Sequence, residues 1–169
     1  MGVLEIRLLG DPVLRERADE VREFCDDLRK LAEDMFETMY AAEGIGIAAP
    51  QVGVSKRLFV MDVGDSEAGP TAVVNPVIME RSGSERVDEG CLSLPGLFGG
   101  VDRSVHIVVE GKDLDGEPIR IEASDLLARC IQHEIDHVDG ILFIDRLSPI
   151  KRRMLASKWK KLQKEDARR

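Results

Sequence analysis

Apolar residues recur at intervals of three and four between residues 26 and 42, which is the spacing of one face of an α-helix. This stripe consists of Leu28, Leu31, Ala32, Met35, Phe36, Met39 and Tyr40. Gly44 follows the stripe, and glycine commonly ends a helix because it adopts the left-handed conformation at little cost. The pattern therefore predicts an amphipathic helix from about Asp26 to Ala42, with its apolar face in the core.

Short runs rich in β-branched and aliphatic residues predict strands in the middle of the chain. These runs are residues 57–63, 72–79, 105–110 and 118–122. Pro76 interrupts the second run, and residues 65–70 have the composition of the turn that precedes it. Asp115-Gly116 lies between the last two runs and is typical of a tight hairpin turn.

Capping residues predict three further helices. Asp11 precedes a proline, which predicts a short helix. Ser124 is expected to cap a helix over residues 125–138, Gly140 to end it, and Ser148 to begin a final helix. Strands and helices do not alternate regularly, so we expect an α+β fold with small mixed sheets around a central helix, followed by a C-terminal helix.

Two segments are rich in glycine: residues 44–53 suit neither a helix nor a long strand, and residues 81–103 are expected to be irregular around Glu89–Gly96. The first contains a loose Gly-x-Gly-x-x-Ala pattern, which resembles a dinucleotide-binding fingerprint. That fingerprint has to follow a strand and open a helix. Here it follows a helix, and Pro50 blocks the next one. We therefore expect no nucleotide cofactor.

The composition is that of an ordinary globular protein, with 43% hydrophobic and 33% charged residues. The 169 residues suit one domain spanning residues 1–169. No apolar run is long enough to span a membrane, and the first residues lack the basic and apolar regions of a secretory signal. Three widely spaced cysteines argue against a disulfide framework and favour the cytoplasm.

Charge is distributed unevenly along the chain. The net charge is −8, yet residues 149–169 contain nine Lys and Arg residues against two Asp and Glu residues. The rest of the chain is strongly acidic, which argues against a broad nucleic-acid-binding face. A loose apolar stripe runs through the basic segment at Ile150, Leu155, Trp159 and Leu162. The simpler interpretation is a solvated basic helix packed on an acidic body.

Two of the three histidines, His133 and His137, lie four residues apart within the predicted helix 125–138. Residues at this spacing share one helix face, so both imidazoles can address one ion. Glu134 follows His133 directly and can reach a water on that ion. This His-Glu-x-x-His arrangement is the signature of zinc hydrolases.

A hydrolytic metal site needs three protein ligands and one open position. The longer His-Glu-x-x-His motif places a third histidine where this chain has Phe143, and no glutamate follows before Glu165. Cys91 lies in a glycine-flanked segment and is the best remaining candidate, since a thiolate binds Zn²⁺ or Fe²⁺ well. Cys25 and Cys130 are expected to be small buried residues, with Cys130 near the pocket.

Three segments match the peptide deformylase family in order and rough spacing, and the chain resembles that family. They are Gly44–Gln51, Glu89–Pro95 and Gln132–Gly140, with further similarity at Asp11–Leu14 and Ile141–Leu147. The resemblance covers about the first 147 residues. It implies a catalytic core over residues 1–147 and a separate basic helix over residues 148–169.

The resemblance implies a metal ion bound by Cys91, His133 and His137. The implied reaction removes the N-formyl group from the N-terminal methionine of newly made polypeptides and releases formate. Metal-bound water would attack the formyl carbon, with Glu134 as general base and then general acid. A general zinc endopeptidase and a non-enzymatic module stabilised by a metal are the alternatives. A purely structural site would favour a fourth Cys or His ligand.

The developing oxyanion needs hydrogen-bond donors, which the Gln51 side chain and the backbone N–H of Leu92 can supply. By analogy with the family, the backbone near Ile45 would pair with the substrate as an added strand, beside an apolar pocket for methionine. The expected substrate-binding residues are Ile45, Gly46, Gly90, Leu127 and Cys130.

The resemblance also implies the cofactor and the partners. It favours Fe²⁺ in the cell, while Zn²⁺ or Ni²⁺ would be compatible with the purified protein. The expected partners are N-formylmethionyl nascent peptides. Since such a substrate emerges from the ribosome, it favours an alternative interpretation of the C-terminal helix, in which the helix docks on ribosomal RNA. No membrane partner is expected.

Overall fold

The computed structural model describes residues 2–64 and 68–169, so residues 65–67 of the predicted turn lie outside the described part. The helices are α1 (Asp26–Ala41), α2 (Asp125–Val138) and α3 (Pro149–Ala167), with short 3₁₀ helices η1 (Pro12–Arg15), η2 (Ala49–Val52) and η3 (Phe143–Arg146). The strands are β1 (Gly46–Ala48), β2 (Leu58–Met61), β3 (Thr71–Ser82), β4 (Glu85–Glu89), β5 (Gly99–Arg103), β6 (His106–Lys112) and β7 (Pro118–Ser124).

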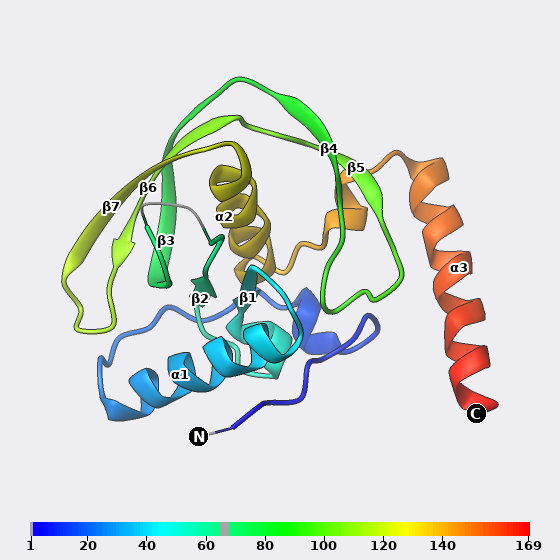
Figure 1. Cartoon of the computed structure of the whole chain (residues 1–169), viewed down its shortest axis with the longest axis horizontal. Coiled ribbons are helices and arrows are strands. Elements are labelled where there is room, and N and C mark those ends of the chain that lie inside the picture. Colours follow the sequence, from blue (N-terminus) through cyan, green and yellow to red (C-terminus); the bar gives the residue numbers. More distant parts are fainter. Residues whose placement is uncertain (1, 65–67) are drawn as a thin grey trace.

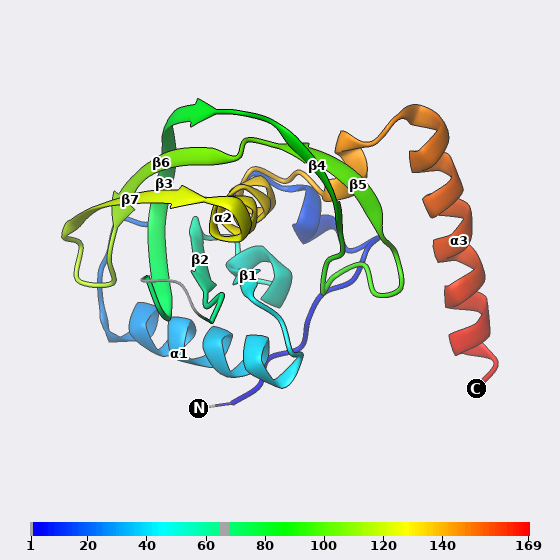
Figure 2. The same ribbon diagram turned by 45° about the horizontal axis from the view of Figure 1, so that its top comes forward.

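Among the described residues, five strands form an antiparallel sheet in the order β1-β2-β3-β6-β7, with β1 at one edge. The other two strands, β4 and β5, pair with each other. Since β3 continues into β4 and β5 into β6, these strands form one long ribbon that arches over α2 (Figures 1 and 2). The ribbon thereby brings the segment after β4 to the side of α2. The expected α+β class is confirmed.

The two faces of β2 explain how the layers pack. Phe59 and Met61 point into a core cluster with α2, while Leu58 and Val60 point into a second cluster with α1. All four side chains are fully buried, as expected for a strand with a helix on either face. The sheet therefore separates α1 from α2 and holds α2 in the centre of the molecule (Figure 1).

The predicted helices at 26–42 and 125–138 are confirmed. Ser124 occupies the N-cap position of α2 but does not cap it, because its Oγ lies 2.8 Å from His106 Nδ1 instead. The backbone is irregular around Pro76, where the β3–β6 register shifts. Gly140 adopts a φ of 77°, and a Cβ there would lie 2.6 Å from the Arg15 carbonyl oxygen.

Within residues 81–103 the irregular part is residues 90–98, and strands β4 and β5, which the sequence did not predict, form on either side of it. Four of the five residues of β4 are exposed, so the strand carries no inward-facing apolar alternation. Its stability comes from pairing with β5 rather than from its own burial pattern.

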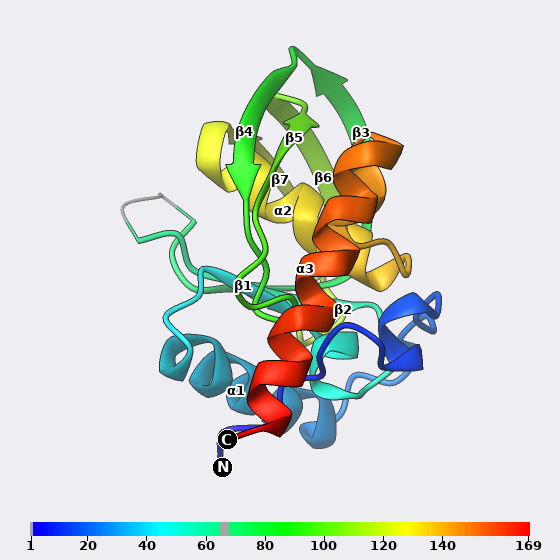
Figure 3. The same ribbon diagram turned by 90° about the vertical axis from the view of Figure 1, so that its right-hand side faces the viewer.

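Helix α3 lies along one side of the molecule and contains no buried residue (Figure 3). Its apolar contacts with the body come from Leu155, Trp159 and Leu162. Ile150 does not belong to this stripe, since it is 69% exposed. No helix among the described residues is both long enough and apolar enough to cross a membrane.

Candidate active site

Helix α2 places two imidazoles side by side. His133 and His137 are one turn apart, and their Nε2 atoms lie 3.2 Å from each other. Ile131, Ile135 and the neighbouring apolar residues of the helix are buried against the sheet, which fixes how far α2 is rotated about its axis. The helix therefore turns both histidines toward the ribbon.

The ribbon supplies a sulfur atom to the same point. Cys91 follows β4 directly, and its Sγ lies 3.3 Å from His137 Nε2. Ligand atoms of Cys91, His133 and His137 all lie within 4.8 Å of one another. One soft sulfur and two imidazole nitrogens are a donor set suited to Zn²⁺ or Fe²⁺. The geometry thus brings together the three residues expected to be ligands.

The two histidines differ in their electrostatics. Burial lowers the pKa of His137 well below its usual value, and a charge on His133 lowers it further. The neutral form is the one that binds metal. For His133 burial acts in the same direction, but contacts with Cys91 and Glu89 outweigh it and raise the pKa. A bound cation would have to displace that additional proton.

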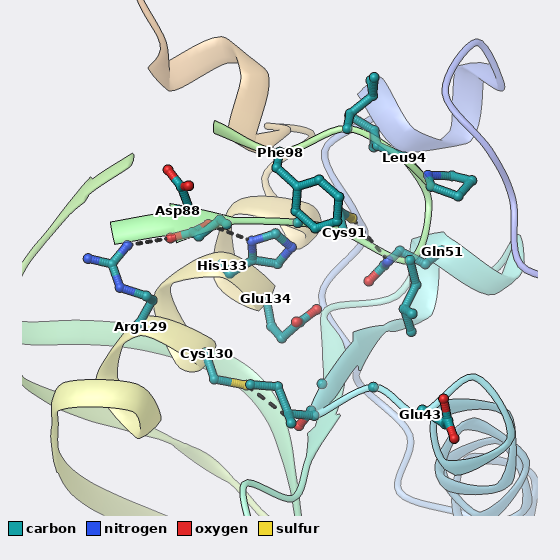
Figure 4. A pocket seen from close by; sticks show the side chains of 18 of the residues that line it. Glu43, Gln51, Asp88, Cys91, Leu94, Phe98, Arg129, Cys130, His133 and Glu134 are labelled. Atoms are coloured by element: carbon teal, nitrogen blue, oxygen red, sulfur yellow. Dashed lines mark hydrogen bonds and ion pairs between the residues drawn. The ribbon is translucent and has the colours of Figure 1, made fainter. Parts of the chain in front are cut away.

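Glu134 lies beside this cluster and faces the groove, between His133 and Cys130 in Figure 4. Its Oε1 is buried and has no hydrogen-bond partner among the described residues. Burial raises the pKa of Glu134 to about 7, while a charge on His133 opposes this increase. A carboxylate with such a pKa exchanges protons readily near neutral pH.

Gln51 and Leu92 present donors near the sulfur. The Gln51 side chain is almost fully buried, and its Oε1 accepts from the Ala48 N–H at 2.9 Å. This bond fixes the amide so that Nε2 lies 3.1 Å from Ser93 Oγ and 3.6 Å from Cys91 Sγ. No described residue accepts a hydrogen bond from the backbone N–H of Leu92.

A groove of about 490 Å³ opens above these groups (Figure 4). Its lining includes the expected residues Ile45, Gly46, Gln51, Gly90, Cys91, Leu92, Cys130, His133 and Glu134. His137 lies behind the groove and is almost fully buried. The pKa of Cys130 is raised well above its usual value, first by burial and then by Glu134, which favours a neutral thiol.

The structure does not place Leu127 in this groove. Leu127 packs against the core cluster between α2 and the sheet, while Leu126 and Arg129 line the groove instead. Neighbouring helix residues differ in direction by about 100°. Sequence reasoning therefore selected a residue that belongs to the wrong face of the helix.

A buried ion-pair network, which the sequence did not predict, supports the groove. Glu89 Oε1 lies 2.9 Å from His133 Nδ1, and Arg103 donates two hydrogen bonds of 2.9 Å to the same carboxylate. Arg103 also donates to Asp136 at 2.6 Å, and Asp136 in turn accepts from Arg146. Although burial opposes it, hydrogen bonds from Arg103 and His133 lower the pKa of Glu89. Glu89 is therefore a carboxylate that orients His133.

The α+β fold, the His-Glu-x-x-His helix and the cysteine that lines the groove are together typical of metallohydrolases. The comparisons with known proteins narrow this class. The family model described as polypeptide deformylase matches residues 3–153. The peptide deformylase of Hydrogenovibrio crunogenus is 50% identical over 167 residues, which is 99% of each chain.

Solved structures agree. A peptide deformylase from Legionella pneumophila has a TM-score of 0.92 at 44% identity and covers 99% of each chain. The Ehrlichia chaffeensis enzyme in complex with actinonin has a TM-score of 0.90 at 42% identity and covers 95% of this chain and 98% of that one. The chain belongs to the peptide deformylase family. It is therefore a hydrolase of a metal-dependent family that removes N-formyl groups from nascent peptides.

Proposed function

We propose that this chain hydrolyses the N-formyl group of N-formylmethionyl peptides, with Cys91, His133 and His137 as the metal ligands and Glu134 as the general base and acid. The observation that carries the proposal is the convergence of the three ligand atoms within 4.8 Å of one another, with Glu134 beside them. We propose that one domain carries this activity, and that it consists of a catalytic core over residues 1–147 and a basic helix over residues 148–169.

A divalent ion at this site would polarise the formyl oxygen and lower the pKa of a water. Fe²⁺ is the metal that we propose for the cell, and Zn²⁺ or Ni²⁺ would suit the same donors. The hydrogen bond between Glu89 and His133 leaves Nε2 of that imidazole available to the ion.

Glu134 moves the proton in the proposed reaction. Its carboxylate takes a proton from the attacking water as the new C–O bond forms at the formyl carbon. It then delivers that proton to the nitrogen as the C–N bond breaks, which yields formate and a free amino group. The unpartnered Glu134 Oε1 is the atom that we assign to this transfer.

Gln51 Nε2 and the Leu92 N–H are proposed to stabilise the negative oxygen of the tetrahedral intermediate. The bond from Ala48 to Gln51 Oε1 holds the amide in place before the substrate arrives. Preorganised donors of this kind contribute roughly 2.7–4 kcal/mol each in well-studied hydrolases.

The edge strand β1 supports the proposed mode of substrate binding. An extended peptide can add to a free strand edge through backbone hydrogen bonds. Ile45 and Gly46 lie at that edge, Cys130 Sγ lies 3.6 Å from the Ile45 carbonyl oxygen, and Gly90 lines the same groove. The aliphatic side chains of Ile45 and Leu126 give the groove an apolar wall for the methionine side chain.

The proposal is tested by anaerobic metal analysis together with formate release from formyl-Met-Ala. We expect one metal ion per chain, which Cys91→Ala should lose because two protein ligands hold an ion poorly. Glu134→Gln should keep the metal and lower turnover by about 10²–10⁴-fold. Activity of Glu134→Gln close to that of the unaltered protein would assign the proton transfer to another group.

The choice between a deformylase and a general endopeptidase rests on the substrates. Formyl-Met-Ala should release formate, acetyl-Met-Ala should react far more slowly, and casein should not be cut. Cleavage of casein without formate release would contradict the proposal.

We also propose that α3 docks on ribosomal RNA. Its basic side chains are exposed, and among the described residues only Arg152 forms an ion pair with the body, at 3.2 Å from Asp145. Co-sedimentation with ribosomes should fall steeply with added salt and should disappear when Lys158, Lys160 and Lys161 are replaced by Glu. Binding that these changes leave intact would place the contact elsewhere.

A further inference from the structure

Arg129 lies at the boundary between the substrate groove and the buried ion-pair network. It lies on α2, four residues before His133, and it lines the groove. Its guanidinium donates from Nη1 to Glu89 Oε2 at 2.7 Å and to the Val101 carbonyl at 3.0 Å. It also donates from Nη2 to the Glu85 carbonyl at 2.7 Å. The Arg129 side chain therefore connects α2 to two strands of the ribbon, β4 and β5.

Glu89 connects this side chain to the proposed metal ligand. A carboxylate can only accept hydrogen bonds, so the 2.9 Å contact requires His133 to donate from Nδ1 to Glu89 Oε1. Arg129 binds the other oxygen of the same carboxylate (Figure 4). The result is a continuous path from the groove wall through Arg129 and Glu89 to the imidazole.

Arg103 and Arg129 contribute to this arrangement in different ways. Arg103 lies on β5, is 5% exposed, and is absent from the groove lining. It neutralises Glu89 and Asp136 behind the site. Arg129 comes from the same helix as the ligand and lines the groove. It is therefore the residue through which the width of the groove and the orientation of Glu89 are linked.

We propose that Arg129 is a positioning residue: its guanidinium fixes Glu89, and through it His133, while its stem forms part of the substrate wall. The inference rests on the proposed assignment of His133 as a metal ligand. It predicts that the two roles can be separated by a side chain that keeps the stem and loses the donors. Methionine is such a side chain, since it has similar length and no charge.

The test compares Arg129→Met and Arg129→Lys with the unaltered protein. Arg86→Met is the matched control, because Arg86 also joins β4 to β5, through two bonds to Asp102, but touches neither Glu89 nor the groove. Zn²⁺ affinity is measured by competition with a chelator, and the visible spectrum is recorded for the Co²⁺-loaded proteins. KM and kcat are measured with formyl-Met-Ala.

Arg129→Met should weaken Zn²⁺ binding by about tenfold. This is the lower end of the range seen when a group that hydrogen-bonds to a metal ligand is disturbed, because Arg103 still holds Glu89. Its Co²⁺ spectrum should shift, and its KM should change little because the stem is retained. Arg129→Lys should recover most of the affinity, since it restores a charged donor. Arg86→Met should resemble the unaltered protein in every measurement.

Unchanged Zn²⁺ affinity and an unchanged Co²⁺ spectrum in Arg129→Met would overturn the inference and leave Arg129 as a wall residue only. Equal losses of Zn²⁺ affinity in Arg129→Met and Arg86→Met would also overturn it, since both variants would then report a general loosening of the ribbon. If Arg129→Met does not fold, Arg129→Leu, which also lacks donors, decides: weakened affinity together with a shifted Co²⁺ spectrum supports the inference, and unchanged values overturn it. Failure of the unaltered protein to bind Zn²⁺ would instead contradict the proposed function, because Cys91, His133 and His137 would then not be metal ligands.

Discussion

Gly46 is the position where the smallest change should have the largest effect on activity. Strand β1 passes so close to α2 that a Cβ on residue 46 would lie 2.7 Å from Glu134 Oε2 and 2.8 Å from Cys130 Sγ. Both distances are shorter than real contacts of a Cβ, and both neighbouring side chains are buried. The backbone of Gly46 has an ordinary negative φ, so alanine would meet no strain of its own there.

Gly46→Ala should therefore act on Glu134 rather than on the fold of β1. To make room, the carboxylate has to move by several tenths of an ångström or more, away from the position assigned to proton transfer. A displacement of about 1 Å in a catalytic group commonly costs about 10²-fold in rate, or roughly 2.7 kcal/mol of activation free energy. Overpacking should also lower the unfolding free energy by about 1–3 kcal/mol.

Formate release from formyl-Met-Ala measures the effect, and metal analysis accompanies it. The metal content should remain that of the unaltered protein, because the three heavy atoms nearest to the new methyl group belong to Glu134 and Cys130 and not to a proposed ligand. Gly2→Ala is the control, since a Cβ there has no heavy atom within 4 Å. A kcat for Gly46→Ala equal to that of the control would refute the reasoning, and so would loss of the metal as the main effect.

Three further predictions concern charge and oxidation. Arg103→Met should lower the unfolding free energy in urea by about 3 kcal/mol, because two buried carboxylates lose the cation that they share, although Glu89 keeps Arg129 and Asp136 keeps Arg146. The exposed Arg86→Met should have a far smaller effect, and equal losses would contradict this. In the metal-free protein, the folded state binds the Glu134 proton more tightly than the unfolded state does, since its pKa rises from 4.5 to about 7. Relative to Glu134→Gln, the unaltered protein should lose about 3 kcal/mol of stability as the pH rises from 4.5 through 7, and a constant difference would disprove it. Finally, the iron-loaded enzyme should lose activity in air faster than the zinc-loaded form, through oxidation of the metal or of Cys91, and equal half-lives would exclude the metal-centred route.

The central helix and its chemistry could be predicted from the sequence because both are local properties. The period of apolar residues defines α2, and the spacing of His133 and His137 places them on one face. Cys91 was the best remaining candidate for the third ligand, and the family resemblance implied the full set, since no local rule connects segments that lie 46 residues apart. The structure brings all three together.

What could not be predicted depends on tertiary contacts. The partners of Arg103 lie 14 and 33 residues away, so its role leaves no pattern in the sequence. Leu127 and Arg129 are only two residues apart, yet they occupy different faces of α2, and only the docked ribbon decides which face lines the groove. The strands β4 and β5 likewise depend on each other rather than on their own composition.

The bent ribbon also orders the assembly of the site as the chain folds. His133 and His137 are four residues apart, so they become neighbours when α2 forms, within about a microsecond. We expect Cys91 to approach them later, when β3 and β6 have paired and the ribbon has closed over the helix. Such non-local contacts form late, because loop closure costs entropy before the contacts compensate for it. We therefore expect the sulfur to be the last of the three groups to arrive, with the docking of the ribbon as the step that completes the site.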